Sequence, residues 1–314
     1  MKTLETIGER ALLRTLCAGL ATRPDVVLGA GDDAALVRCG ERDWVLTSDA
    51  LLEGRHFLPE TNAERIGHKA LARALSDLAA MGAEADWVLV DLQAPRDTPI
   101  MRVRGIYAGL NRLAERVRVA IVGGDTTESE PLGLHVFAVG HLPAGTARRR
   151  DGAKPGDCVG VTGPLGGSRA GHHLDFTPRL AEGLLLRDHA NAMIDVSDGL
   201  SVDARHLAER SGVTILLDAA AIPLRPCLAH LPREAGLTQA LHDGEDFELL
   251  FTLPPAGMAE LERAWQARTL SIPPPTIIGR VEAGAPAVFL QQPSGSIPLS
   301  VEGYDHFREH DARR

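Results

Sequence analysis

Aspartates recur along the chain where a short apolar run ends beside glycine or a small hydroxyl residue. The aspartates that stand out are Asp32, Asp33, Asp49, Asp77, Asp125, Asp195 and Asp198, with Asp77 in a predicted helix. Magnesium takes oxygen ligands, commonly one or two carboxylates per ion, and phosphate and water complete its shell. Neighbouring glycines let the backbone approach a phosphate, and clustered carboxylates raise one another's pKa unless cations lie between them. The pattern predicts a site for a metal-bridged polyphosphate.

Each segment taken alone also fits a structural role. Aspartate beside glycine is common in turns, and Asp77 by itself fits a solvated helix face. The segments together favour the shared metal site. Common nucleotide motifs are missing, because none of the three lysines (Lys2, Lys69 and Lys154) lies in a P-loop pattern. If ATP is used, another scaffold must hold it.

Alternating strands and helices must position these residues. Amphipathic helices are predicted at Leu4–Leu20, Ala63–Met81, Pro99–Arg116, Arg179–His189, Ser201–Ser211 and Ala256–Arg268. Strands are predicted at Val26–Gly29, Ala34–Val37, Trp44–Ser48, Asp86–Leu92, Val119–Gly123, Leu134–Gly140, Cys158–Thr162, Ala192–Asp195, Thr214–Leu217, Phe247–Thr252 and Thr276–Val281. A Gly-, Pro- and charge-rich segment at 142–157 predicts two domains, an α/β domain over 1–142 that binds ATP and metal, and an α+β domain over 143–314.

Composition excludes some classes of function. The 314 residues carry a formal net charge of −9, which argues against nucleic acid as a partner. No run of 18 apolar residues predicts a membrane span, and the N-terminus does not resemble a signal peptide. The four cysteines match no metal-binding spacing, so a reducing cytoplasm is the expected location.

Six ordered motifs resemble the thiamine-monophosphate kinase family, within the aminoimidazole-ribonucleotide synthetase superfamily. They are Gly31–Ala34 (GDDA), Thr47–Phe57 (TSDALLEGRHF), Ser76–Ala83 (SDLAAMGA), Gly123–Thr127 (GGDTT), Asp195–Leu200 (DVSDGL) and Gly244–Phe251 (GEDFELLF). The resemblance implies a PurM-like α/β N-terminal domain whose strands form a dimer-spanning β-barrel, a PurM-like α+β C-terminal domain, and a homodimer. It implies direct transfer of the γ-phosphoryl of ATP to thiamine monophosphate with several Mg²⁺ ions, the last step in making thiamine diphosphate.

The resemblance also implies roles for individual residues. The metal ligands would be Asp32, Thr47, Ser48, Asp49, Asp77, Asp125, Asp195 and Asp198, of which Asp49, Asp77 and Asp125 would be catalytic. The ATP contacts would be Tyr107, Gly124, Asp125, Arg150 and Ser197. The contacts to the thiamine moiety would be His56, Glu245 and Tyr304. The sequence departs from the family pattern at Arg55, where valine is usual, and at Asp243 on the substrate-side loop, where glycine is usual.

The implied acceptor is itself a phosphate, with a second pKa of about 6, so it needs no general base. The difficulty is to bring two anions together, which metal ions resolve. Two alternatives stay open. The chain could be another enzyme of the superfamily, acting on aminoimidazole precursors or selenium, or a non-catalytic binding regulator on the same scaffold.

Overall fold

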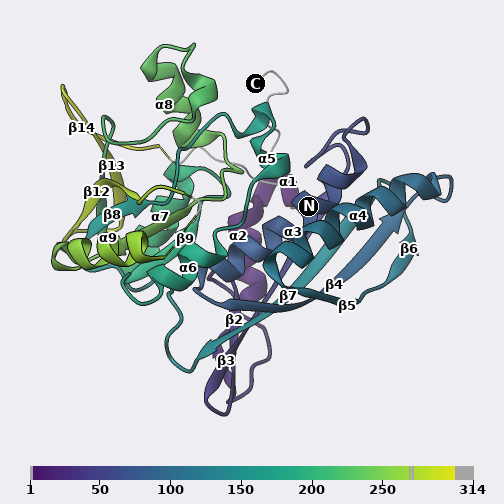
Figure 1. Cartoon of the computed structure of the whole chain (residues 1–314). Coiled ribbons are helices and arrows are strands. Elements are labelled where there is room, and N and C mark those ends of the chain that lie inside the picture. Colours follow the sequence, from purple (N-terminus) through teal and green to yellow (C-terminus); the bar gives the residue numbers. More distant parts are fainter. Residues whose placement is uncertain (1–2, 269, 271, 301–314) are drawn as a thin grey trace.

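Two mixed β-sheets lie side by side, with helices between them (Figure 1). The computed structural model describes residues 3–268, 270 and 272–300. Helix α3 (Ala63–Ala80) belongs to the first sheet's half of the molecule and packs against α5 (His172–Asp175), α6 (Leu180–Leu186) and strand β9 (Ala192–Asp195) of the second half. None of the described helices has the length and apolar character that crossing a membrane requires.

The first sheet has the strand order β1-β2-β3-β7-β4-β5, and β6 also lies beside β4. Neighbours run antiparallel, except that β5 and β6 run parallel to β4. Its strands are β1 (Val26–Leu28), β2 (Ala35–Cys39), β3 (Arg42–Leu52), β4 (Glu84–Ala94), β5 (Ala120–Gly123), β6 (Thr126–Glu128) and β7 (Gly133–Pro143).

Helices α3 and α4 (Ile100–Val117) cover one face of the first sheet and bury a core of aliphatic side chains. The two helices approach closely, because a Cβ at Gly67 would lie 1.9 Å from the Ile106 carbonyl oxygen and one at Gly109 1.9 Å from that of Glu64. This contact fixes α3, and α3 in turn carries several of the residues described below.

The opposite face of the first sheet is open and apolar. Ladder partners Leu46, Val139 and Trp87 form one row across β3, β7 and β4, and Ser48, Phe137 and Leu89 form the next. Leu46, Trp87, Leu89 and Phe137 are each about two-fifths exposed, at 39%, 43%, 43% and 39%. An outward face of this kind on a sheet of a soluble domain typically marks a contact surface.

The second sheet has the order β14-β13-β10-β12-β8-β11-β9, in which only β10 and β13 pair in parallel. Its other strands are β8 (Cys158–Val161), β10 (Thr214–Asp218), β11 (Leu249–Leu253), β12 (Thr276–Glu282), β13 (Ala287–Gln292) and β14 (Gly295–Pro298). The helices of this half, besides α5 and α6, are α7 (Leu200–Ser211), α8 (Arg233–His242), α9 (Met258–Ala267) and the short 3₁₀ segments η1 (Ser168–Ala170), η2 (Pro226–Leu228) and η3 (Pro255–Gly257).

The two-sheet α/β organisation agrees with the sequence-based prediction. Among the described residues neither sheet closes on itself, so the dimer-spanning barrel is not seen in a single chain. The domain division at residues 142 and 143 stays a prediction; β7 ends at Pro143 and β8 begins at Cys158.

Two local predictions are wrong. The single helix at Leu4–Leu20 is divided into α1 (Leu4–Ile7) and α2 (Glu9–Cys17), because Gly8 adopts a φ of 73° between them. Strand β3 continues to Leu52, so Asp49 lies inside the strand and does not follow its end.

Candidate functional site

Three carboxylates from both halves of the molecule meet at one point. One carboxylate oxygen from each of Asp33, Asp77 and Asp195 lies within 4.8 Å of the other two. Asp33 lies between β1 and β2, Asp77 on the last turns of α3, and Asp195 at the end of β9. Among the described residues this is the one such group that could hold a metal ion. The meeting of these three carboxylates depends on how the two halves of the molecule pack together.

Hydroxyl groups hold two of these carboxylates in place. The Thr47 hydroxyl on β3 donates to Asp77 Oδ2 at 2.5 Å, and the buried Ser76 hydroxyl donates to Asp195 Oδ2 at 2.6 Å. Thr47 can do so because it shares the inner face of β3 with Asp49. Ser48 alternates to the open face, beside Phe137 of β7.

Arg150 sits against the first aspartate pair. Its guanidinium donates to both oxygens of Asp33, at 2.7 and 3.2 Å, and its backbone N–H donates to Asp32 Oδ2 at 3.1 Å. Both aspartate side chains are almost completely buried, at 1% exposure. Burial acts against the charged form of Arg150, but Asp33 and Asp32 hold its pKa above the usual value.

Burial and mutual repulsion raise the pKa of the carboxyls in this region. Burial first, and then the charge of Asp33, raise the pKa of Asp195 to about 7, and the same two causes raise that of Asp32 to about 7. Burial and then the charges of Asp195, Asp49 and Asp33 raise the pKa of Asp77 as well. A divalent cation would relieve this repulsion, and an all-oxygen donor set suits Mg²⁺. The residues present therefore fit the predicted metal.

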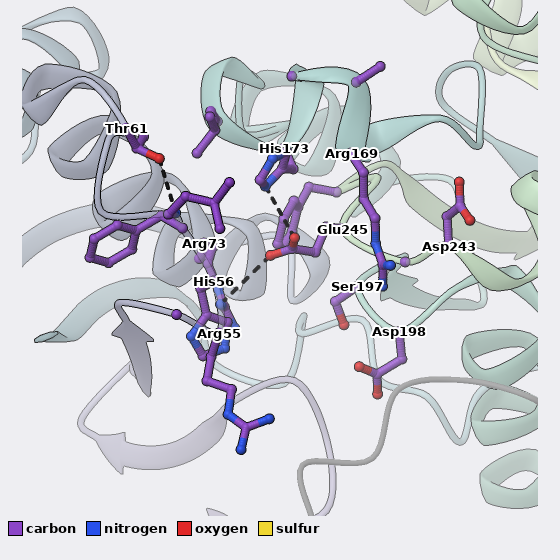
Figure 2. Close-up of a pocket in the computed structure, with 18 residues that line it drawn as sticks. Arg55, His56, Thr61, Arg73, Arg169, His173, Ser197, Asp198, Asp243 and Glu245 are labelled. Carbon is purple, nitrogen blue, oxygen red and sulfur yellow. Dashed lines mark hydrogen bonds and ion pairs between the residues drawn. The ribbon is translucent and has the colours of Figure 1, made fainter. Parts of the chain in front are cut away.

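Asp49 links the carboxylate group to a neighbouring cavity. Its two oxygens accept from Arg73 of α3 at 2.9 and 3.3 Å. Arg73 also lines a cavity of about 650 Å³, which is large enough for a small organic molecule. Figure 2 shows the charged residues around it. The cavity is lined by Gly54, Arg55, His56, Phe57, Leu58, Thr61, Arg73, Arg169, Ala170, Gly171, His173, Leu174, Ser197, Asp198, Asp243, Gly244, Glu245 and Phe247.

Glu245 lies in one wall of this cavity, where Arg73 and His173 approach its carboxylate (Figure 2). Its carboxylate lies 2.6 Å from Lys69 Nζ, 3.2 Å from His173 Nδ1 and 4.0 Å from Arg73 Nη1. Burial would raise the pKa of Glu245, but the His173 contact and the charges of Lys69 and Arg73 outweigh it and lower that pKa to about 2. Glu245 is therefore ionised and charge-matched.

The structure places the predicted residues in several parts of the molecule. Asp32, Thr47, Asp49, Asp77, Asp195 and Arg150 surround the carboxylate group, whereas His56, Ser197, Asp198 and Glu245 line the cavity. Gly124 and Asp125 lie in the exposed turn between β5 and β6, where a Cβ at Gly124 would lie 1.9 Å from the Val90 carbonyl oxygen. Tyr107 is on α4, where burial and then Asp91 raise its pKa. Tyr304 lies outside the described residues.

The aspartate pattern included Asp33, but the ligand set implied by the family resemblance did not, and sequence reasoning missed Lys69, Arg73 and His173 at the cavity. One signal was present in the sequence. Lys69, Arg73, Ser76 and Asp77 are spaced i, i+4, i+7 and i+8, which places them on one face of a helix. Asp33 could not be separated from Asp32 by spacing, because which of two adjacent residues turns inward depends on the loop conformation.

The fold and the carboxylate group together define a class, the proteins related to AIR synthase. The sequence model of the family described as "AIR synthase related protein, N-terminal domain" matches residues 31–142. Hydrogenase maturation protein HypE, in its complex with HypF, is similar in fold alone, at 18% identity and a TM-score of 0.73.

More similar proteins narrow this class. The thiamine-monophosphate kinase of Escherichia coli K12 is 36% identical over 310 residues, covering 91% of this chain and 94% of the relative, and that of Aquifex aeolicus is 35% identical over 327 residues, covering 97% and 99%. A solved structure described as AaThiL complexed with AMPPCP and TMP has a TM-score of 0.86 at 34% identity and covers 98% of this chain and 99% of that one. The chain belongs to the thiamine-monophosphate kinase family.

Proposed function

We propose that this chain transfers the γ-phosphoryl of ATP directly to thiamine monophosphate, giving thiamine diphosphate and ADP as the last step in making thiamine diphosphate. The observation that carries the proposal is the meeting of Asp33, Asp77 and Asp195 beside a cavity lined by His56 and Glu245. The E. coli and Aquifex relatives are named for this reaction, and the complex with AMPPCP, an ATP analogue, and TMP matches its two substrates.

The residues divide the work between two neighbouring places. Asp32, Asp33, Asp49, Asp77, Asp125, Asp195 and Asp198, with the Thr47 hydroxyl, would supply oxygen ligands for several Mg²⁺ ions. The Ser48 side chain faces the other side of β3 and is left out of this set. Bound Mg²⁺ would neutralise the charge that both phosphates bring. Tyr107, Gly124, Arg150 and Ser197 would hold ATP. His56, Glu245 and Tyr304 would orient the thiamine moiety, with the anionic Glu245 near the thiazolium ring.

No residue has to remove a proton from the acceptor. The phosphate of thiamine monophosphate is largely ionised at neutral pH, so its oxygen is already a nucleophile. The protein would then contribute alignment and exclusion of water, which are the main requirements of phosphoryl transfer. This agrees with direct transfer and no phosphoenzyme.

The test is to incubate the purified protein with ATP, MgCl₂ and thiamine monophosphate and to separate the products by chromatography. Equimolar thiamine diphosphate and ADP, with neither formed after chelation of Mg²⁺, is the expected result. Unphosphorylated thiamine serves as the matched control acceptor. ADP without thiamine diphosphate would reject this acceptor and return the choice to the other enzymes of the superfamily, whereas binding of both substrates without turnover would favour the regulator.

We also propose a homodimer that acts in the cytoplasm and joins two copies through the open face of the first sheet. The exposed side chains of Leu46, Trp87, Leu89 and Phe137 on this face support the dimer, since two such faces would bury each other. The four free cysteines suit a reducing compartment. Light scattering should give twice the chain mass, and W87E should reduce it to the monomer; a wild-type monomer at micromolar concentration would reject the dimer.

A further inference from the structure

Lys69 is a completely buried lysine whose ammonium group has three close partners. Its Nζ lies 2.7 Å from the His56 carbonyl oxygen, 2.7 Å from His173 Nδ1 and 2.6 Å from Glu245 Oε1. The side chain has 0% exposure. The ammonium donates to the His56 carbonyl oxygen, lies within hydrogen-bond distance of His173 Nδ1, and forms an ion pair with Glu245. A buried charge is costly unless it is paired and hydrogen-bonded, and here it is both.

Each partner of Lys69 comes from a different segment of the cavity wall. His56 follows β3, His173 lies in α5, and Glu245 lies between α8 and β11. All three line the cavity, whereas Lys69 lies behind them and is not among the lining residues. A ligand in the cavity would therefore contact the partners of Lys69 but not Lys69 itself.

Glu245 lies in a strained stretch of backbone. Its backbone has a φ of 55°, a left-handed conformation that is unfavourable for residues other than glycine. The backbone N–H of Glu245 donates to the Ser197 carbonyl oxygen at 2.7 Å, which fixes the main chain. Lys69 Nζ forms an ion pair with Oε1 of the side chain, and His173 Nδ1 lies 3.2 Å from Oε2. Since such strain persists only where surrounding contacts enforce it, Lys69 completes the set that holds this carboxylate in the cavity wall.

We propose that Lys69 is a positioning residue that holds Glu245 in the conformation that receives the cationic acceptor. The role rests on the proposed function, in which Glu245 contacts the thiamine moiety. Lys69 thus controls affinity for the acceptor and not for ATP. A purely structural contact between the two halves already exists one turn earlier on α3, where Arg65 pairs with Asp175 and donates to the Gly171 carbonyl oxygen.

The experiment compares K69M with R65M, which removes a neighbouring ion pair between α3 and α5. We expect K69M to raise the KM for thiamine monophosphate by about 10- to 100-fold, the loss typical of one charge-assisted contact. The KM for ATP and kcat should stay within about twofold of the wild type, and R65M should leave all three constants within that range. Thermal unfolding of each variant reports on folding.

A double variant tests whether Lys69 acts through Glu245. In the E245Q background, K69M should raise the KM for thiamine monophosphate by less than about twofold, because residue 245 no longer carries the charge that pairs with Lys69. K69M/E245Q leaves no unpaired buried carboxylate, so it remains interpretable if K69M alone does not fold. The positioning role is overturned if K69M raises both KM values equally or if its effect persists beside E245Q. Failure of the proposed function would appear separately, as absence of thiamine diphosphate from the wild type.

Discussion

The carboxylate group and the Glu245 wall lie on the same face of α3, but their charges are arranged in opposite ways. Asp33, Asp77 and Asp195 crowd like charges together, and burial with mutual repulsion raises the pKa of Asp77 and Asp195. Glu245 is surrounded by cations, and its pKa is lowered to about 2 in spite of burial.

The two charge arrangements illustrate two ways in which a protein can prepare a binding site before its ligand is present. Repelling carboxylates cost stability in the protein alone and gain it from a bound cation. A matched ion pair is stable by itself and keeps its geometry before any ligand arrives. We therefore expect neutral substitutions in the two regions to change the free energy of unfolding in opposite directions.

The largest effect should come from D77N. Removing a metal-ligating carboxylate should lower kcat by about 100- to 1,000-fold, the range seen when one preorganised electrostatic contact is lost. The same change removes a repelled, buried charge, so the metal-free protein should unfold at a higher temperature. Steady-state kinetics and calorimetry measure both, with the exposed Asp188 changed to Asn as the control. A less stable D77N protein would contradict the repulsion at this site.

E245Q should have a smaller effect than D77N. It should lower the free energy of unfolding, whereas D77N should raise it. It leaves Lys69 buried without its counter-ion, which costs about 3–5 kcal/mol when a buried pair is broken. We expect roughly 2 kcal/mol, because Lys69 can release its proton; burial already lowers its pKa to about 8. Urea unfolding of E245Q and D77N side by side makes the comparison. If the two variants shift in the same direction, the contrast between the regions fails.

The smallest effect should appear in the pH dependence of stability without metal. The folded-state pKa of Asp195, about 7, lies above its ordinary 3.8, so its stabilising contribution is present below about pH 4 and lost as pH rises through 7. For Glu245 the contribution is present above its ordinary 4.5 and lost as pH falls through about 2. Melting temperatures of the wild type minus those of D195N should decline by a few degrees between pH 4 and 7. Saturating MgCl₂ should flatten that decline; a flat curve in its absence would contradict the raised pKa.

The sequence predicts the regular elements well where apolar spacing is sustained. The predicted helix at Ala63–Met81 is α3 within one residue, and the strand at Ala192–Asp195 coincides with β9. The prediction misses β6, β13, β14 and α5, because their few residues carry too little periodicity. It also misses α8, because the sequence of this helix has little amphipathic contrast. Strand β3 was predicted too short, since Asp49 interrupts the apolar pattern but is paired with Arg73 in the folded chain.

The motifs that resemble the family located the aspartates in the sequence, but they could not give the contacts between distant segments. Lys69 and Glu245 are far apart in sequence, and only the packing of α3 against the second half brings them to 2.6 Å. His173 likewise lies on α5, a one-turn helix with no sequence signal of its own. Residues of this kind are defined by tertiary packing, which a single sequence does not display.

Helix α3 also bears on how an enzyme of this kind could be redesigned. Lys69 serves the cavity and Asp77 the carboxylate group, and eight residues of helix separate them by about 12 Å. Because Gly67 and Gly109 clamp the helix against α4, that separation is set by the backbone and not by either ligand. An engineer can therefore vary the Lys69 end, with His173 and Arg55 around it, to accept a different phosphorylated molecule. The phosphoryl-donating end would remain as it is.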